Sequence, residues 1–202
     1  LCFLVYRMGL QDKALVVASD VLFARGRWQG LKTNDLDYYL DLIRNNHLFL
    51  VRADVEEDPT WQQIVSYIVF KHKGHCFVYS YLEKASEQRL KNDYMVGIGG
   101  HIDLVDATNS DVIDTAVARE WDEEVMYNGV LNKKLVGLLN DDRRPVEAVH
   151  VGLVYLFEGD TPNIEVREKD ILRGEMVPFK KLESYLAGSH GWAPLLHKEY
   201  LC

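Results

Sequence analysis

The sequence contains little cysteine, little proline and no long apolar run, and each shortage excludes a class of protein. The three cysteines, Cys2, Cys76 and Cys202, form no CxxC pair, which excludes a disulfide framework and a thiolate zinc site and predicts a reducing, cytoplasmic location. Only 5 of the 202 residues are proline, and 27% are charged against 48% hydrophobic, so disorder and low-complexity architectures are not expected. No apolar run is long enough to span a membrane, and no membrane contact is expected.

The beginning of the chain gives no sign of a targeting segment. The apolar run 1–6 is short and is followed, rather than preceded, by Arg7, unlike a signal peptide. Because the first residue is Leu, residues 1–12 are expected to be a trimmed or extended N-terminus, with Met8 as a candidate natural start. No repeat or flexible linker divides the chain, so a single domain over residues 1–202 is expected.

The charge is negative overall and unevenly distributed. Asp and Glu number 31 against 23 Lys and Arg, a net charge of −8, which disfavours nucleic acid as a partner because phosphate-backbone binding requires a basic surface. The excess is concentrated in residues 103–124, where Arg119 is the single base among eight acids: Asp103, Asp106, Asp111, Asp114, Glu120, Asp122, Glu123 and Glu124. This concentration predicts a requirement for bound cations.

The hydrophobic pattern predicts an α+β fold, a layered αβα sandwich with a mixed β-sheet. Strands are expected over 14–23, 48–51, 64–71, 76–82, 94–98, 134–139, 148–157 and 171–172, with a hairpin turn at 72–75. Helices are expected over 35–43, 111–127, 178–186 and 194–201. Ser110 or Asn109 is expected to cap the helix 111–127, and Asn128 and Gly129 are expected to end it.

That helix carries the chemistry that the sequence predicts. At 100° per residue, Glu120, Glu123 and Glu124 fall on one face, where like charges repel unless a cation compensates them. A hard divalent cation, Mg²⁺ or Mn²⁺, is the simplest compensator, because such ions prefer oxygen ligands. Gly99 and Gly100 end a predicted strand just before the helix and let the main chain turn close to a ligand. Metal, carboxylates and exposed backbone together suit phosphoryl transfer to water.

The same segment resembles the Nudix box, G-x5-E-x7-R-E-U-x-E-E-x-G-U, where U is an aliphatic residue. Residues 119–124, Arg-Glu-Trp-Asp-Glu-Glu, match R-E-U-x-E-E, and Gly100 matches the first glycine. Five further segments, 56–59, 63–64, 87–90, 97–102 and 140–142, are similar to a bacterial Nudix subgroup of predicted phosphoesterases, over about residues 14–200.

The resemblance implies a Nudix-like fold and an enzyme that hydrolyses a nucleoside diphosphate linked to another moiety, by water attack at phosphorus. It implies Glu120 and Glu124 as leading metal ligands, Glu123 as a further ligand or as a residue that acts through metal-bound water, and Arg119 as the residue that orients Glu120 or its neighbours. The Gly99 carbonyl is an expected extra ligand, while Gly100, His101 and Asp103 are expected at the substrate. The general base is expected from Asp141, Asp142 or Glu147, and a homodimer is the expected assembly.

Two positions depart from the box. The box glutamate is absent: Asp106 keeps its distance from Gly100, and Asp111 keeps its distance to Arg119, so the loop is about five residues longer and either acid can replace it. Met126 stands at the last glycine, which predicts a longer last turn of the helix.

Three alternatives compete with these assignments. A non-catalytic Nudix-fold module that senses a nucleotide or nucleotide-sugar is disfavoured by the complete set of glutamates. An isopentenyl diphosphate isomerase requires a catalytic cysteine, and Cys76 lies in a predicted hairpin. His72, His75 and Cys76 have zinc-like spacing without a second cluster, so a turn is favoured, and His150 is expected to be a hydrogen-bonded core residue.

Overall fold

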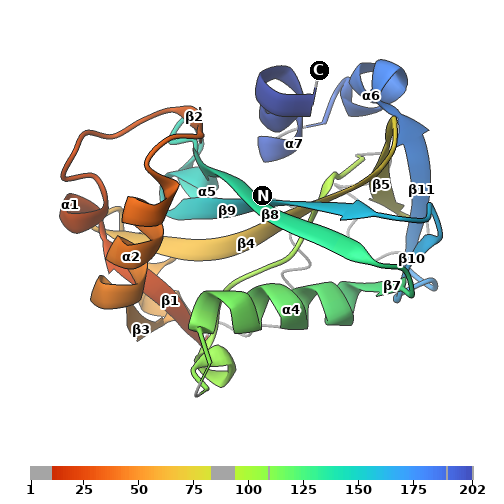
Figure 1. Cartoon of the computed structure of the whole chain (residues 1–202). Helices are drawn as coiled ribbons and strands as arrows, with labels where there is room; N and C mark the ends of the chain where they lie inside the picture. Colours follow the sequence, from red (N-terminus) through yellow and green to blue (C-terminus); the bar gives the residue numbers. More distant parts are fainter. Residues whose placement is uncertain (1–10, 83–93, 109, 190, 202) are drawn as a thin grey trace.

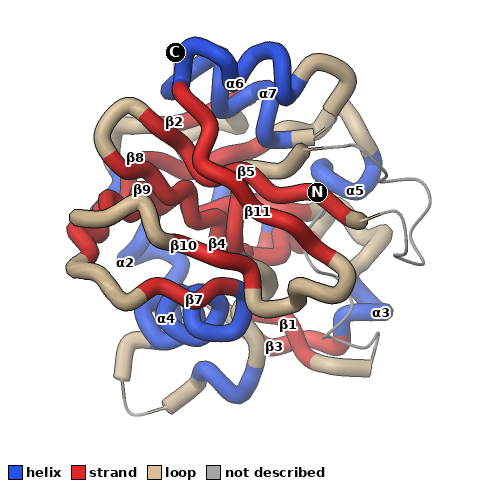
Figure 2. The backbone as a smooth tube through the Cα atoms, turned by 90° about the vertical axis from the view of Figure 1, so that its right-hand side faces the viewer, coloured by secondary structure: helices blue, strands red, loops and turns tan. Residues whose placement is uncertain are grey.

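A mixed β-sheet forms the centre of the molecule, with helices on both faces (Figure 1). The computed structural model describes residues 11–82, 94–108, 110–189 and 191–201. Helix α4 (Val112–Glu124) covers one face of the sheet, and α6 (Phe179–Leu186) and α7 (Trp192–Leu196) cover the other. The same layers are visible after a quarter turn (Figure 2). The predicted α+β fold with a mixed sheet is confirmed.

The strands of the main sheet follow the order β11-β5-β4-β9-β8-β2, and β4 and β9 run parallel while the other pairs are antiparallel. β1 pairs with β3 and with the start of β4, and β6 pairs with β4. The bounds are β1 (Lys13–Ala18), β2 (Gly30–Lys32), β3 (Leu48–Val51), β4 (Trp61–His72), β5 (His75–Tyr81), β6 (Gly97–Ile98), β8 (Leu131–Asn140), β9 (His150–Gly159) and β11 (Leu172–Pro178). A separate pair joins β7 (Val125–Tyr127) to β10 (Ile164–Val166).

The remaining helices are short, apart from α2 at one end of the sheet. They are α1 (Ser19–Leu22), α2 (Leu36–Asn46), α3 (Arg52–Val55), α5 (Pro145–Ala148) and the helical turns η2 (Leu104–Asp106) and η3 (His197–Leu201). The predicted helices over 35–43, 178–186 and 194–201 are present with shifted ends.

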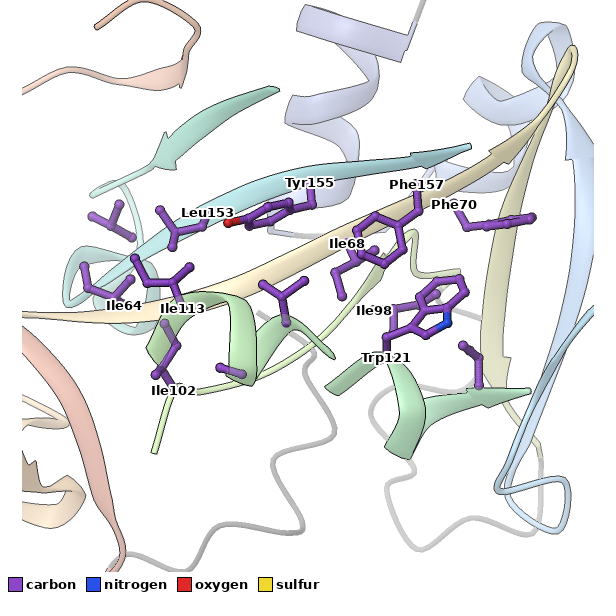
Figure 3. Packing of buried hydrophobic residues seen from close by; sticks show 14 of the residues in the cluster. Ile64, Ile68, Phe70, Ile98, Ile102, Ile113, Trp121, Leu153, Tyr155 and Phe157 are labelled. Carbon is purple, nitrogen blue, oxygen red and sulfur yellow. The ribbon is translucent and has the colours of Figure 1, made fainter. Parts of the chain in front are cut away.

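Alternation along β4 divides the core into two clusters, because successive side chains of a strand point to opposite faces. Ile64, Ile68 and Phe70 point toward α4, where they pack with residues of β9 and with Ile113 and Trp121 (Figure 3). The odd-numbered Val65, Tyr67 and Val69 pack instead against the C-terminal helices, including Trp192. Consecutive residues of β4 therefore point to opposite faces of the sheet.

The predicted helix over 111–127 is wrong at its end. Helix α4 stops at Glu124, and Val125, Met126 and Tyr127 form β7, with Val125 aligned with Val166 of β10. Residues 125–127 continue the helical pattern but are also good strand formers, and pairing with β10 decides between the two. Met126 therefore marks a change from helix to strand rather than a longer last turn.

The cap of α4 also differs from the prediction. Asp111 is the N-cap, and its Oδ1 accepts hydrogen bonds from the backbone N–H groups of Ile113 and Asp114, each at 3.0 Å. Ser110 precedes the cap, and Asn109 lies outside the described residues, as do residues 1–10 and 87–90.

Several strand boundaries move. The predicted strand over 14–23 ends at Ala18, where α1 begins, and 148–157 begins with the last residue of α5. Only Gly97 and Ile98 of the segment 94–98 form a strand, and 171–172 is the start of the longer β11. β2 and β10 were not predicted. The hairpin is confirmed, with His72 aligned with His75 across a two-residue loop.

Candidate active site

The glycine pair lies where the chain leaves β6 and runs alongside β4. Gly99 has a φ of 138°, a conformation that residues with a side chain rarely adopt, and a Cβ there would collide with the Ser66 carbonyl. The Gly100 carbonyl accepts a hydrogen bond from the Ser66 N–H at 2.9 Å, and its N–H donates to the Ser66 hydroxyl at 3.3 Å. Ser66 therefore fixes the backbone of the turn, a role that sequence reasoning missed although Ser66 interrupts the apolar stretch 64–70.

The Glu120 carboxylate lies directly against Gly100. A Cβ added to Gly100 would lie 2.9 Å from Oε1 and 3.0 Å from Oε2 of Glu120, so the absence of a side chain creates the space that this carboxylate uses. Glu120 is buried, and burial raises its pKa to about 7 even though the Arg119 guanidinium acts in the opposite direction. The predicted proximity of the glycine pair and the glutamate face is present.

Arg119 is the centre of an ion-pair network. Its Nε and Nη2 donate to the two carboxylate oxygens of Asp106, each at 2.8 Å, and Nη1 donates to Glu120 at 2.7 Å and to Glu123 at 3.4 Å. Nη2 also donates to the His101 carbonyl at 3.1 Å. Burial opposes the charge of Arg119, but the Asp106 carboxylate more than compensates and raises the pKa of the guanidinium.

The two candidates for the box glutamate have different positions. Asp106 is 1% exposed and forms the bidentate contact with Arg119. Asp111 caps α4 and accepts a hydrogen bond from Nε of Arg44 at 2.6 Å. Asp106 is therefore the acid that contacts the box arginine.

Asp103 belongs to the same loop. Its carboxylate accepts from the Val105 N–H at 2.8 Å, while its own N–H donates to Asp106 Oδ2 at 3.0 Å, so it caps the turn η2. Burial raises its pKa. The contacts of Asp103 hold Asp106 in place, whereas its expected contact with substrate stays a prediction.

The donor chemistry at this face fits a hard divalent cation, because Glu120, Glu123 and Glu124 supply carboxylate oxygens and one of them is desolvated. In the described part of the chain, however, no three His, Cys, Asp or Glu side chains converge as a metal site. The Arg119 guanidinium contacts both Glu120 and Glu123 and supplies the positive charge between them. The three glutamates are therefore ligands of the type that Mg²⁺ or Mn²⁺ prefers. In this structure the guanidinium of Arg119 supplies the compensating positive charge.

The three candidate bases occupy one loop between β8 and β9 and differ in their partners. Asp141 is held by Arg143, whose Nε and Nη2 each donate at 2.7 Å, and this contact lowers the pKa of Asp141. The Asp142 carboxylate accepts from Gln29. Glu147 is fully buried in α5 and forms an ion pair with Arg144 at 3.2 Å.

His101 and His150 meet above β4. Their Nε2 atoms are 3.1 Å apart, and His150 Nδ1 contacts the Val146 carbonyl at 2.5 Å. Both histidines are buried, and burial lowers the pKa of each, to about 4 for His150. This pair connects the residue after Gly100 to the turn that carries Glu147, and His150 is the hydrogen-bonded core residue that was predicted.

The alternative sites have ordinary structural roles. His72 Nδ1 contacts the Gly159 carbonyl at 2.8 Å and belongs to the hairpin. Cys76 is fully buried, which raises its pKa to about 12, so its thiol lacks the thiolate character that a catalytic cysteine requires.

Over the described ranges, every helix is too short or too polar to cross a bilayer.

Comparisons with known proteins find one relative by sequence and several proteins of similar fold. No family model matches the chain. Protein YmaB of Bacillus subtilis (strain 168) is 30% identical over 186 residues, which cover 87% of this chain and 90% of YmaB.

Solved structures show the same fold. Tm1382, a protein assigned to the Nudix hydrolases, superposes with a TM-score of 0.80 over 94% of this chain and 98% of its own, at 25% identity. DR0079 from Deinococcus radiodurans shares the fold, with a TM-score of 0.51 over 67% of this chain and 80% of its own, at 17% identity. The predicted Nudix-like fold is thus confirmed, and with the carboxylate helix behind the glycine turn, the chain belongs to the Nudix hydrolase family.

Proposed function

We propose that the chain is a metal-dependent hydrolase that cleaves a pyrophosphate bond in a nucleoside diphosphate linked to another moiety, by attack of water at phosphorus. The observation that supports this most directly is the Glu120 carboxylate, buried against Gly100 while Asp106 holds the neighbouring Arg119. A buried carboxylate is costly unless a cation accompanies it, and the one guanidinium of Arg119 is shared by Asp106, Glu120 and Glu123, so a divalent cation would add positive charge where three carboxylates share one base.

The implied ion is Mg²⁺ or Mn²⁺, and Glu120, Glu123, Glu124 and the Gly99 carbonyl would hold it. When bound, such an ion supplies positive charge that polarises a phosphate and lowers the pKa of water.

The protein's own contribution is to position the carboxylates. Asp106 fixes the guanidinium of Arg119 at two points, and Arg119 in turn fixes Glu120 through Nη1. Gly100 leaves the space in which the carboxylate lies, and Ser66 holds the turn through both backbone groups of Gly100. Preorganisation of this kind reduces the rearrangement required when substrate binds.

The general base is proposed from Asp142 or Glu147, because the Asp141 carboxylate is held at two points by Arg143, which lowers its pKa. A carboxylate held in that way is a weaker proton acceptor. A cytoplasmic location, a homodimer and the absence of nucleic acid partners stay predictions.

A substrate panel tests the proposal. The panel contains nucleoside triphosphates, ADP-ribose, NADH, dinucleoside polyphosphates, coenzyme A and prenyl diphosphates, each assayed with Mg²⁺ and with Mn²⁺. We expect turnover of at least one nucleoside diphosphate compound and its loss in metal chelator. Glu124→Gln is expected to lower kcat about 100-fold on the best substrate, because an amide is a weaker ligand for a hard cation.

Asp122→Asn is the matched control, since it makes the same acid-to-amide change at an exposed position of α4. It is expected to retain activity. Full activity of Glu124→Gln would contradict the site assignment. Binding without turnover across the whole panel would support the non-catalytic sensing module instead.

A further inference from the structure

We propose that two copies of this chain pair through the outer edge of β3 (Leu48–Val51), so that an antiparallel sheet continues from one protomer into its partner. The inference goes beyond the proposed function, because it concerns a surface that the hydrolase assignment does not use. It commits to a second copy of the chain as the occupant of this edge and assigns which backbone groups of β3 meet the partner.

β3 is the outermost strand at its end of the sheet. Among the described strands it pairs with β1 alone, and it lies at the margin of the molecule beyond β1 (Figure 1). The outer side of such a strand presents backbone N–H and C=O groups that no neighbouring strand bonds. An edge of this kind can therefore pair with a strand of another chain.

The side chains of β3 are apolar and incompletely covered. Leu48 is 51% exposed, and Phe49, Leu50 and Val51 are half-buried. Neither Leu48 nor Leu50 belongs to the two core clusters that the described residues form. A partner that covers these side chains would therefore add apolar contacts that a single chain lacks.

Other edge strands of the main sheet carry charges that oppose such pairing. β11 exposes Arg173 and Glu175, and β2 ends in Lys32. Residues 47–51 contain no Asp, Glu, Lys, Arg or proline. Because charges and proline are the usual protection of an edge strand, β3 is the less protected edge.

The alternation of hydrogen bonds along β3 identifies the groups that face outward. The Arg52 N–H donates to the Asp12 carbonyl at 2.8 Å, at the end of the aligned β1–β3 pair. In an antiparallel pair, residues at even distances from Arg52 therefore bond to β1, and those at odd distances point their backbone groups away from it. His47, Phe49 and Val51 are at odd distances, so their backbone groups face the open edge.

Two of these outward groups are already used within the chain. The His47 N–H donates to the Ile43 carbonyl at 3.0 Å. Val51 is the N-cap of α3, so its carbonyl accepts the first hydrogen bond of that helix. Within the described part of the chain, four groups are left for a partner: the His47 carbonyl, the Phe49 N–H, the Phe49 carbonyl and the Val51 N–H.

This set of four groups is complementary to itself. If two copies of β3 run antiparallel about a two-fold axis at Phe49, this residue exchanges two hydrogen bonds with the partner's Phe49. In the same register, the Val51 N–H donates to the carbonyl of the partner's His47, and the axis repeats the bond. The ladder omits only the bond from His47 N–H to the partner's Val51 carbonyl, the two groups that are already used. A second copy therefore satisfies every open group of this edge.

The same register also pairs the side chains. Leu48 lies opposite the partner's Leu50 on one face of the joined sheet, and the axis repeats this contact. These are non-hydrogen-bonded pairs, in which the side chains of an antiparallel sheet approach most closely. Cross-strand apolar pairs stabilise a sheet, so the most exposed side chain of β3 is covered by the pairing that completes its backbone.

Sedimentation of the full chain over about 10 nM to 100 µM tests the proposal, and we expect a monomer–dimer equilibrium. Leu48→Lys should raise the dissociation constant about tenfold or more, because each lysine would face the partner's Leu50. Val130→Lys is the matched control: Val130 is 73% exposed and lies outside β3, so the same change there should leave the equilibrium unaltered. A monomer over the whole range, or a dimer that Leu48→Lys leaves unchanged, would overturn the inference.

Hydrogen exchange of the wild-type protein locates the interface without a variant that must fold. It is measured at two concentrations on either side of the dissociation midpoint. The amide hydrogens of Phe49 and Val51 should exchange more slowly at the higher concentration, because only the dimer bonds them. Exchange that is fast at both concentrations would place the interface elsewhere, and slow exchange at both would show that the same chain covers the edge. Either result contradicts the proposal, and neither depends on hydrolase activity.

Discussion

Asp106 holds Arg119 through both carboxylate oxygens, each at 2.8 Å, across thirteen residues of sequence. The contact fastens the loop between Gly100 and α4 to Arg119, the residue that precedes Glu120 on the helix. It is also the contact for which sequence spacing allowed two candidates. Everything that Arg119 positions, Glu120 above all, depends on this attachment.

Replacing Asp106 with Asn should therefore impair both activity and stability. One of the two charged contacts becomes a donor facing a donor, and breaking a buried ion pair typically costs about 3 kcal/mol. We expect that loss in chemical denaturation, together with a fall in kcat of about 10- to 100-fold with KM nearly unchanged. Asp111→Asn is the control, because asparagine caps a helix about as well as aspartate, so the variant loses mainly the ion pair with Arg44 and should leave kcat intact. A large fall in kcat for Asp111→Asn with little change for Asp106→Asn would show that Asp111, and not Asp106, takes the role of the box glutamate.

The two glycines of the turn should respond differently to alanine. At Gly100 the new methyl group meets the end of the Glu120 side chain, which can move, so we expect a small loss of stability and a large loss of activity. At Gly99 the methyl group meets the Ser66 backbone at a φ of 138°, and a loss of about 2–3 kcal/mol is expected.

The Gly26→Ala variant separates the cost of the positive φ from the cost of the collision with Ser66 at Gly99. Gly26 has a φ of 101° and no atom within 4 Å of an added Cβ, so it measures the cost of the backbone conformation alone. Melting temperatures and kcat values of the three variants provide the comparison. Equal melting temperatures for Gly26→Ala and Gly99→Ala would argue against the predicted collision with Ser66.

His150 should make the protein sensitive to acid. Its pKa falls from 6.5 to about 4 on folding because it is buried, so the unfolded chain binds a proton between these values and the folded chain does not. Stability from this residue is therefore complete above pH 6.5 and is lost as the pH falls toward 4, by up to about 3 kcal/mol. Denaturant titrations at several pH values, compared between wild type and His150→Phe, should show a shallower acid slope in the variant. Identical slopes would refute this origin of acid sensitivity.

The sequence specified the local part of the site well. Three glutamates in helical register behind a glycine pair required only the geometry of one helix and one turn, and the structure places Glu120 at Gly100 as expected. The choice between Asp106 and Asp111 depended on the path of a loop, which the spacing of identical side chains does not determine. The contact between His101 and His150 depended on the path of two segments that are far apart in the sequence, which no local pattern reports.

In the fold, too, the elements with a clear local pattern were predicted, and those that depend on distant pairing were not. The central strands and α2 were predictable because their apolar periodicity was uninterrupted. Residues 125–127 were misassigned because they extend the helical ridge and are also good strand formers, so pairing with β10 determined the outcome. The short β2 was missed because its three residues carry no pattern apart from their partner β8.

The abrupt end of α4 has a consequence for the order in which the protein is made. The last turn of the helix is closed by Arg167, whose backbone N–H donates to the Glu124 carbonyl at 2.9 Å and whose side chain contacts the Asp122 carbonyl. During synthesis, the glutamates of α4 therefore leave the ribosome well before Arg167, which closes the end of that helix. Translation must proceed 43 residues beyond Glu124 before that end of the helix is complete. A nascent chain should thus acquire its acidic centre late, in one step with the docking of the β7–β10 pair.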